Sequence, residues 1–456
     1  MSRPSSDFPE LVQPRTSRLS IDRPSASSLL QRGAPDAKPA VRLSLESPAR
    51  LLLFAVFILV ASLAYLKVCW TQYRAFRFSQ TVSHQNLQKA VDLDPGNDTY
   101  HAQLGRFAFY GEQDSALALR ELSTAVRLNP HDSFDWLDLA NAQMFAGDRA
   151  ASIATVHRAV EANPRTPRLL WGAASLLLVL EQTAESMRLI HQVILDRPDM
   201  MVTIFPLLVR IGLDEKTLFE QALPPRPDVY AAWITFSAGQ KRNEAADAGW
   251  SRLISLQKPL DVKLVQPYLE SLISRHDGNA LRNTWEEIIR LTPKLKPYLP
   301  TNGNLMVNPG FEAPLLDLGP AWRYRQTDNV QVELSSESHT GAHSMAFLFN
   351  DKPVNDLGVY QMLPVQPSTH YRLVAWALSD LQTAVAPHLG VVDTGKLDNS
   401  VTTDRVDTKA GWHPVSVEFT TGPQTSLVIV TLTREASSKL IRGRLLMDDF
   451  QVSEVH

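Results

Sequence analysis

Four prolines recur at a nearly constant interval in the first half of this chain. Pro95, Pro130, Pro164 and Pro198 lie 35, 34 and 34 residues apart, and they close the similar phrases AVDLDP, AVRLNP, AVEANP and VILDRP. A period of about 34 residues ending in proline predicts stacked helix–turn–helix repeats. Because stacked repeats build an extended concave surface, the pattern favours a protein that holds another chain over one that performs chemistry.

The residues inside these periods match a known repeat signature. The matching residues are Leu104, Gly105, Ala125 and Pro130 in one period, and Trp136, Leu139, Ala140, Ala159 and Pro164 in the next. The pattern resembles the tetratricopeptide repeat, although His101 stands where that family has a tryptophan. The resemblance covers residues 71–200 and implies an all-α solenoid with a groove for a protein partner.

The resemblance also implies which side chains line the groove. They lie on the first helix of each repeat: Arg106, Phe109, Asn141, Phe145, Arg168, Trp171 and Ser175. The exposed aromatic rings are expected to anchor an apolar side chain of the partner, and Arg106, Asn141 and Arg168 to bind its carbonyl or carboxylate groups. An alternative stays open for Phe109 and Phe145, because aromatic rings at these positions also pack between adjacent helices.

A single long apolar run precedes the repeats. Residues 51–66, LLLFAVFILVASLAYL, carry no charge, and residues 50–70 are long enough to cross a bilayer as a helix at about 1.5 Å per residue. A cleaved signal peptide is disfavoured, because the run starts far from the N-terminus and no small-residue cleavage site follows it. The sequence predicts one transmembrane helix; a buried helix of a soluble protein is the alternative.

Residues 1–49 are rich in proline and serine and poor in apolar clusters, which predicts a disordered tail. Basic residues flank the apolar run almost equally: Arg32, Lys38, Arg42 and Arg50 precede it, and Lys67, Arg74 and Arg77 follow it. This near balance gives only a weak positive-inside signal. We expect a cytoplasmic tail, a span in the inner (cell) membrane and a periplasmic or extracellular remainder. This choice of orientation rests on the sequence pattern of the C-terminal region.

Helical patterns continue beyond Pro198, although the period blurs. Residues 201–292 are expected to be degenerate helical repeats, and PKLKPYLPTNG, residues 293–303, a stiff polar linker. From residue 304 short alternating stretches such as VQVEL (330–334) and SLVIVTL (426–432) are separated by turn residues. This texture predicts an all-β antiparallel sandwich over residues 304–456.

Four phrases in this last region occur in a recognisable order. They are NLMVNPGFE (304–312), SHTGAHS (338–344), AGWHPVSVEFTT (410–421) and LLMDDFQV (445–452). Together they resemble the galactose-binding-like jelly rolls that serve as carbohydrate-binding modules. In many such modules a structural calcium joins the first strand to the last. The resemblance implies Glu312, Asp448 or Asp449, and backbone oxygens of residues 340–343, as its ligands here. The alternative is that these carboxylates only cap turns.

A glycan site needs exposed aromatic faces and planar hydrogen-bonding groups. In HYRLVAWAL (370–378) alternate residues point to opposite faces, so Arg372 and Trp376 share one face. With Tyr324 they are the predicted sugar platform. Trp322 and Trp412 are expected in the core, and core packing is also the alternative for Trp376.

Composition excludes some classes of function. The net charge of −3 gives no basic field for nucleic acid, and the single cysteine, Cys69, excludes an intramolecular disulfide. GVVDTGKL (390–397) has the spacing of a phosphate-binding loop, but Leu397 replaces the hydroxyl residue that holds Mg²⁺. The sequence therefore predicts a protein without enzymatic activity.

The leading hypothesis is a multidomain scaffold: a transmembrane helix, an all-α solenoid that binds a protein partner, and an all-β jelly roll that contacts glycan. Such a combination suits exopolysaccharide or cell-envelope assembly, by analogy alone. One alternative is a glycan receptor whose repeats are a stalk. Another is a glycan-processing enzyme with an unrecognised site in residues 199–292.

Overall fold

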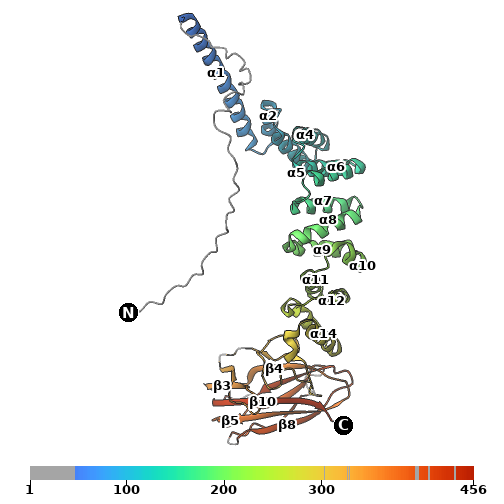
Figure 1. The fold of residues 1–456 in the computed structure, drawn as a ribbon, viewed down its shortest axis with the longest axis vertical. Helices are drawn as coiled ribbons and strands as arrows, with labels where there is room; N and C mark the ends of the chain where they lie inside the picture. The colour runs from blue at the N-terminus through green and yellow to red at the C-terminus, as the bar shows by residue number, and fades with distance from the viewer. Residues whose placement is uncertain are drawn as a thin grey trace, which may run out of the picture. The chain divides into compact units, whose positions relative to one another are not determined.

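The computed structural model describes residues 47–455 except 302, 326, 328, 396–399, 409–410 and 436–437. The predicted tail, residues 1–49, lies almost wholly outside the described residues. Residues 1–77 and 78–456 form two separate units. Along the chain an apolar helix comes first, then a helical region, then two antiparallel sheets (Figure 1). This order confirms the predicted fold class.

The first helix, α1 (Pro48–Ser79), contains the whole predicted span. It is long and apolar enough to cross a membrane, and no residue of its most apolar window is buried. Leu53 and Phe57, for example, are each 69% exposed. Because so large an apolar surface is unfavourable in water, α1 is a candidate membrane span.

Each of the phased prolines follows the end of a helix. The helices of this region are α2 (His84–Leu93), α3 (Asp98–Phe107) with the π-helical turn η1 (Ala108–Glu112), α4 (Ser115–Leu128), α5 (Ser133–Phe145), α6 (Arg149–Ala162), α7 (Pro167–Val179) and α8 (Thr183–Asp196). One residue separates α2, α4, α6 and α8 from the proline that follows, and its ψ lies between 75° and 85° in all four cases. Proline disfavours helical backbone in the residue before it, so each copy ends its helix at the same place.

Residues 198–291 form further helices. They are η2 (Pro198–Met200), α9 (Met201–Ile211), α10 (Glu215–Thr217) with η3 (Leu218–Ala222), α11 (Pro227–Gly239), α12 (Asn243–Ser255), η4 (Val262–Val265), α13 (Gln266–Ser274) and α14 (Gly278–Leu291). The turn inside each hairpin has a residue of positive φ: Gln113, Gly147, Glu181, Gly212, Lys241 and His276. An aspartate next to it often caps the second helix; Asp114 and Asp277 accept hydrogen bonds from the N–H groups of Leu117 and Ala280. The same hairpin geometry therefore continues to residue 291.

The segment 293–303 differs from the predicted linker. Its first part is the 3₁₀ helix η5 (Pro293–Tyr298), in which Leu295 and Tyr298 are buried. The indole N–H of Trp285 donates to the Tyr298 carbonyl at 3.0 Å. Thr292, with ψ 81°, precedes Pro293, so IIRLTP (288–293) is another copy of the phrase that closes each repeat. The segment is packed because it completes the last hairpin.

The C-terminal region is a sandwich of two five-stranded antiparallel sheets. Its strands are β1 (Arg323–Tyr324), β2 (Val330–Ser335), β3 (Ser344–Lys352), β4 (Asp356–Pro364), β5 (His370–Ser379), β6 (His388–Asp393), β7 (Ser400–Thr402), β8 (His413–Thr420), β9 (Leu427–Thr433) and β10 (Ile441–Glu454). One sheet has the order β1-β4-β9-β6-β7 and the other β2-β3-β10-β5-β8. Phe311, Trp322 and Phe450 pack together in the core, with ring centroids 4.8 to 5.7 Å apart.

The last helical hairpin contacts the sandwich directly. The N–H of Gly278, at the start of α14, donates to the Ser426 hydroxyl at 3.1 Å. Arg282 donates to the Pro364 carbonyl at 2.7 Å. Leu427 of β9 belongs to the same buried apolar cluster as the helices. The helical core therefore continues to the first residue of β9, the central strand of its sheet.

Candidate functional site

The first helices of successive hairpins lie next to one another and form one surface. The guanidinium of Arg168 on α7 lies 5.9 Å from the ring centroid of Phe134 on α5. The ring of Phe205 on α9 meets that of Trp233 on α11 at 5.2 Å. Neighbouring helices α11 and α13 also pack together. The predicted groove residues all belong to this row of helices, which includes α3, α5 and α7.

At the N-terminal end of the row Arg106 is already bound. Its guanidinium lies 2.5 Å from a carboxylate oxygen of Asp135 and 2.5 Å from one of Asp138. Asp135 is only 2% exposed, and burial raises its pKa to about 6 although the nearby Arg106 charge acts in the opposite direction. Arg106 is thus already paired with two internal carboxylates, and its binding of a partner carboxylate stays a prediction.

The aromatic side chains of this end form a small surface group. The ring of Phe109 lies 5.6 Å from that of Phe145 and 4.7 Å from that of Tyr110, both edge-on. Phe145 is 58% exposed, whereas Phe109 is half-buried. Phe145 is therefore available to a partner, and Phe109 mainly supports it.

Two predicted polar residues bind their own helices. The Asn141 amide donates to the Leu137 carbonyl at 2.9 Å, and the Ser175 hydroxyl donates to the Trp171 carbonyl at 2.8 Å. The Asn141 amide oxygen and the Ser175 lone pairs remain as acceptors for a partner.

One groove on this surface lies between α7 and α9. It has a volume of about 730 Å³ and brings Trp171 and Ser175 together with Thr203, Pro206, Leu207 and Arg210. Pro206 lies inside α9 and has no N–H, so the Val202 carbonyl lacks its usual helical donor. The groove thus combines apolar walls with an exposed cation, Arg210, and a carboxylate, Glu181.

Sequence reasoning missed the α9 side of this groove. The predicted groove residues stop at Ser175, because the period was not extended past Pro198. The signal was present: α5 and α7 begin three residues after Pro130 and Pro164, and α9 begins three residues after Pro198. The phase of the prolines alone therefore places Met201–Ile211 as the next groove helix.

The predicted glycan platform is divided between the two sheets. Arg372 and Trp376 point to the outer face of β5, as the alternation predicts, while Tyr371 and Leu373 are buried. Tyr324 is in β1, an edge strand of the other sheet. The platform of three residues is corrected, because Tyr324 does not share a face with Arg372 and Trp376.

A different aromatic group surrounds Trp376. The imidazole of His339 stacks on its indole with centroids 3.9 Å apart and a 13° angle between planes, and Trp412 lies 5.6 Å from His339. Asp449 binds the His339 Nδ1 at 2.6 Å and so orients the ring. Trp412 is half-buried, not in the core as expected. The stack covers one face of Trp376, so a sugar would meet the edge of this group.

The three predicted calcium ligands converge on Gly310. A Cβ built there would lie 3.5 Å from Asp449 Oδ1, 3.6 Å from Asp448 Oδ1 and 4.0 Å from Glu312 Cγ. Glu312 accepts hydrogen bonds from the N–H groups of residues 342 and 343, and Asp448 from those of 339 and 340. Burial raises the pKa of Asp448, and the neighbouring Asp449 charge adds to this effect.

The carboxylates alone do not make a metal site. Within the described ranges, no three His, Cys, Asp or Glu side chains are close enough to hold a metal ion by themselves. Calcium coordination commonly takes backbone carbonyls as well as carboxylates. The residues present fit such a mixed ligand set, in the small space beside Gly310.

Comparison with known proteins gives partial similarities. No protein-family model matches the chain, and no curated protein matches it. The solved structure of TmCBM61 in complex with β-1,4-galactotriose is 22% identical over 34% of this chain and 100% of that chain, with a TM-score of 0.26.

Two solved structures are similar to the helical region. MamA is 13% identical over 38% of this chain and 86% of that chain, with a TM-score of 0.25. The first TPR of Spaghetti (RPAP3) bound to an HSP90 peptide is 16% identical over 26% of this chain and 92% of that chain, with a TM-score of 0.22. Similarities of this size do not establish a family.

Proposed function

We propose that this chain is a membrane-anchored scaffold without enzymatic activity. In this proposal α1 crosses the inner membrane, the residues before it are cytoplasmic, and residues 71–456 lie outside, where they take part in exopolysaccharide or cell-envelope assembly. A reporter active only in the cytoplasm, fused to the C-terminus, tests this orientation and is expected to be inactive. The groove between α7 and α9 binds a segment of a partner protein, and the sandwich contacts glycan.

The α7–α9 groove is the observation that carries the protein-binding part. Interfaces draw most of their energy from a few large apolar anchors in pockets. Trp171 forms one wall and Leu207 the other, on neighbouring helices. Arg210 has no ion-pair partner in the described part of the chain and lies at the same groove, so it can bind a carbonyl or carboxylate of the bound segment.

Trp171→Ala is expected to weaken partner binding about thirtyfold, because loss of one large anchor costs about 2 kcal/mol. The measurement is affinity capture of membrane proteins by the full-length chain, followed by titration of the recovered partner. Thr203→Trp is a second test: Thr203 is exposed and lines the groove, so a large ring there fills the groove without removing a core contact.

Val202→Ala is the matched control, since this residue of α9 is 82% exposed and does not line the α7–α9 groove. It is expected to change binding less than either groove variant. If Trp171→Ala and Thr203→Trp keep their helical circular dichroism and bind the partner as tightly as wild type, the groove is not the binding site.

A structural calcium in the sandwich is part of the proposal. Glu312, Asp448 and Asp449 approach one another beside Gly310, and a bound cation would relieve the repulsion between their charges. Removal of calcium by a chelator is expected to lower the free energy of unfolding by about 1–2 kcal/mol. The melting temperature of the full-length chain should then fall by several degrees. Glu312→Gln is expected to remove that response. An unchanged melting temperature in wild type would reject calcium binding here.

A glycan receptor is the second candidate function. The Trp376–His339–Trp412 group supports it, because aromatic rings at a surface suit sugar rings. In this alternative Trp412→Ala abolishes glycan binding, measured by calorimetry with soluble oligosaccharides, and Trp171→Ala has no effect on any function. Partner loss in the Trp171→Ala variant would favour the scaffold instead.

A further inference from the structure

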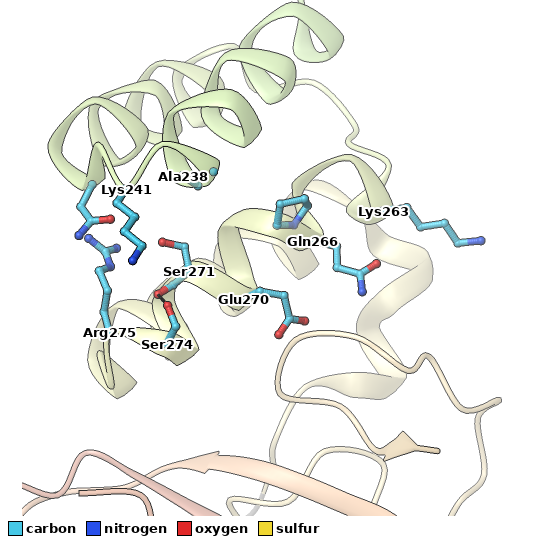
Figure 2. Close-up of a pocket in the computed structure, with 11 residues that line it drawn as sticks. Ala238, Lys241, Lys263, Gln266, Glu270, Ser271, Ser274 and Arg275 are labelled. Carbon is cyan, nitrogen blue, oxygen red and sulfur yellow. Dashed lines mark hydrogen bonds between the residues drawn. The ribbon is translucent and has the colours of Figure 1, made fainter. Parts of the chain in front are cut away.

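A second cavity lies between α11 and α13 (Figure 2). Its volume is about 860 Å³, which is within the range of about 300–1,000 Å³ that small-molecule sites occupy. Three cationic side chains line it, Lys241, Lys263 and Arg275, against one carboxylate, Glu270. Glu270 is itself bound by Arg323 of β1 at 2.5 Å. The wall of the cavity is therefore electropositive.

The cationic groups of this cavity are only partly used inside the protein. Lys241 and Lys263 are exposed and have no ion-pair partner among the described residues. The two terminal nitrogens of Arg275 bind Asp247 at 2.9 and 3.0 Å, while its Nε is buried without a hydrogen-bond partner. In Figure 2 Lys241 and Arg275 lie at one end of α13 and Lys263 at the other. An anionic ligand that extends along α13 would meet positive charge at both ends.

Neutral polar groups occupy the space between the cations. Asn243, Gln266 and Ser271 line the cavity, and their side chains form no hydrogen bond within the described ranges. Amide and hydroxyl groups both donate and accept. They suit a ligand whose groups also donate and accept hydrogen bonds, such as the hydroxyls of a sugar.

No large apolar side chain is among the described residues that line the cavity. Ala238, Gly239 and Pro267 are its apolar members, and no aromatic ring is among the described residues that line it. A protein segment would find no pocket for an anchor side chain here, and a neutral sugar no ring to stack on. Charged and hydrogen-bonding groups are therefore the ones that can select a ligand here.

We propose that the cavity between α11 and α13 binds an acidic oligosaccharide, a chain of sugars that carry carboxylates. The carboxylates bind Lys241 and Lys263, and the hydroxyls bind Asn243, Gln266 and Ser271. This goes beyond the scaffold function, because it places a glycan site on the helical repeats, apart from the outer face of β5.

The test is calorimetric titration of the full-length chain in detergent with oligogalacturonate, a soluble acidic oligosaccharide. Its fully methyl-esterified form is the matched neutral ligand and is expected not to bind. The double variant Lys241→Ala/Lys263→Ala is expected to bind the acidic form about tenfold more weakly, and Glu270→Gln about twofold more tightly. Lys258→Ala is the control, since Lys258 is an exposed lysine outside the cavity.

Several outcomes would overturn the proposal. Equal binding of the methyl ester would show that charge is not used. Loss of binding in Trp376→Ala, with none in the double lysine variant, would place the ligand on the sandwich. Tighter binding of a glutamate oligomer than of oligogalacturonate would assign the cavity to an acidic protein segment.

Discussion

Replacing Gly358 by alanine is expected to destabilise the sandwich by about 3 kcal/mol or more. Gly358 lies in β4 with φ +75°, and a Cβ there would be 2.3 Å from the Arg325 carbonyl oxygen. Backbone strain at a positive φ costs about 1–3 kcal/mol for a residue with a side chain. The clash adds to it, because the contacted atom is main chain and its strand is held by the hydrogen bond from Arg325 N–H to the Gly358 carbonyl at 2.7 Å. Calorimetric unfolding of the full-length chain measures the loss.

Gly303→Ala separates strain from steric clash. Gly303 has the same φ of +75°, but nothing lies within 4 Å of its hypothetical Cβ. This variant is expected to lose only the strain energy, about 1 kcal/mol. Equal losses in the two variants would mean that the close approach of β4 to residue 325 is not rigid.

The stability of the helical region is expected to fall as pH rises between about 4 and 6. Asp135 has a pKa of about 6 in the folded chain against an ordinary value of 3.8, so the folded state holds a proton in this window that the unfolded state has released. Folding therefore favours the protonated carboxyl of Asp135. Above pH 6, where this carboxyl is ionised, the folded state is less stable by up to about 3 kcal/mol. Below pH 3.8 Asp135 is protonated in both the folded and the unfolded state, so this destabilisation disappears.

Asp135→Asn isolates this effect. The stability of the variant relative to wild type is expected to be greatest near pH 7 and to decrease by up to about 3 kcal/mol on acidification to pH 4, measured by urea unfolding. Asp196→Asn is the control: Asp196 is an exposed carboxylate of α8 that does not act on Asp135, so the pH dependence of this variant should follow that of wild type. A constant difference between Asp135→Asn and wild type across this range contradicts the prediction.

Local rules explain what could be predicted for the helices. A proline constrains the residue before it, so the phrase that ends at Pro130 stops its helix wherever the chain packs. The hairpin that ends at Pro293 obeys the same rule: residues 201–292 are expected to be helical repeats, and only Pro293 and the residues after it are assigned to a linker. In the sandwich, alternation correctly gave the outward direction of Arg372 and Trp376, because successive residues of a strand face opposite sides.

The partners of these side chains could not be predicted in the same way. The carboxylate that neutralises Arg106 is 29 residues away, and sequence spacing does not indicate which of several nearby acids approaches it. His339 covers Trp376 from a loop, although the two are separated by a large stretch of chain. Tyr324 resembles a platform residue in sequence, but its strand pairs with β4 in the other sheet.

The sequence by itself determined the apolar helix, the repeat period and the change from helix to strand, because each of these follows from the order of residues along a few turns or strands. Tertiary structure decided where binding surfaces arise. The α7–α9 groove and the α11–α13 cavity each require two helices from different repeats. Their chemistry depends on which charges are already paired within the fold. Arg106 is paired with Asp135 and Asp138, whereas Lys241 and Arg210 have no ion-pair partner among the described residues, since only packing brings opposite charges within a few ångströms.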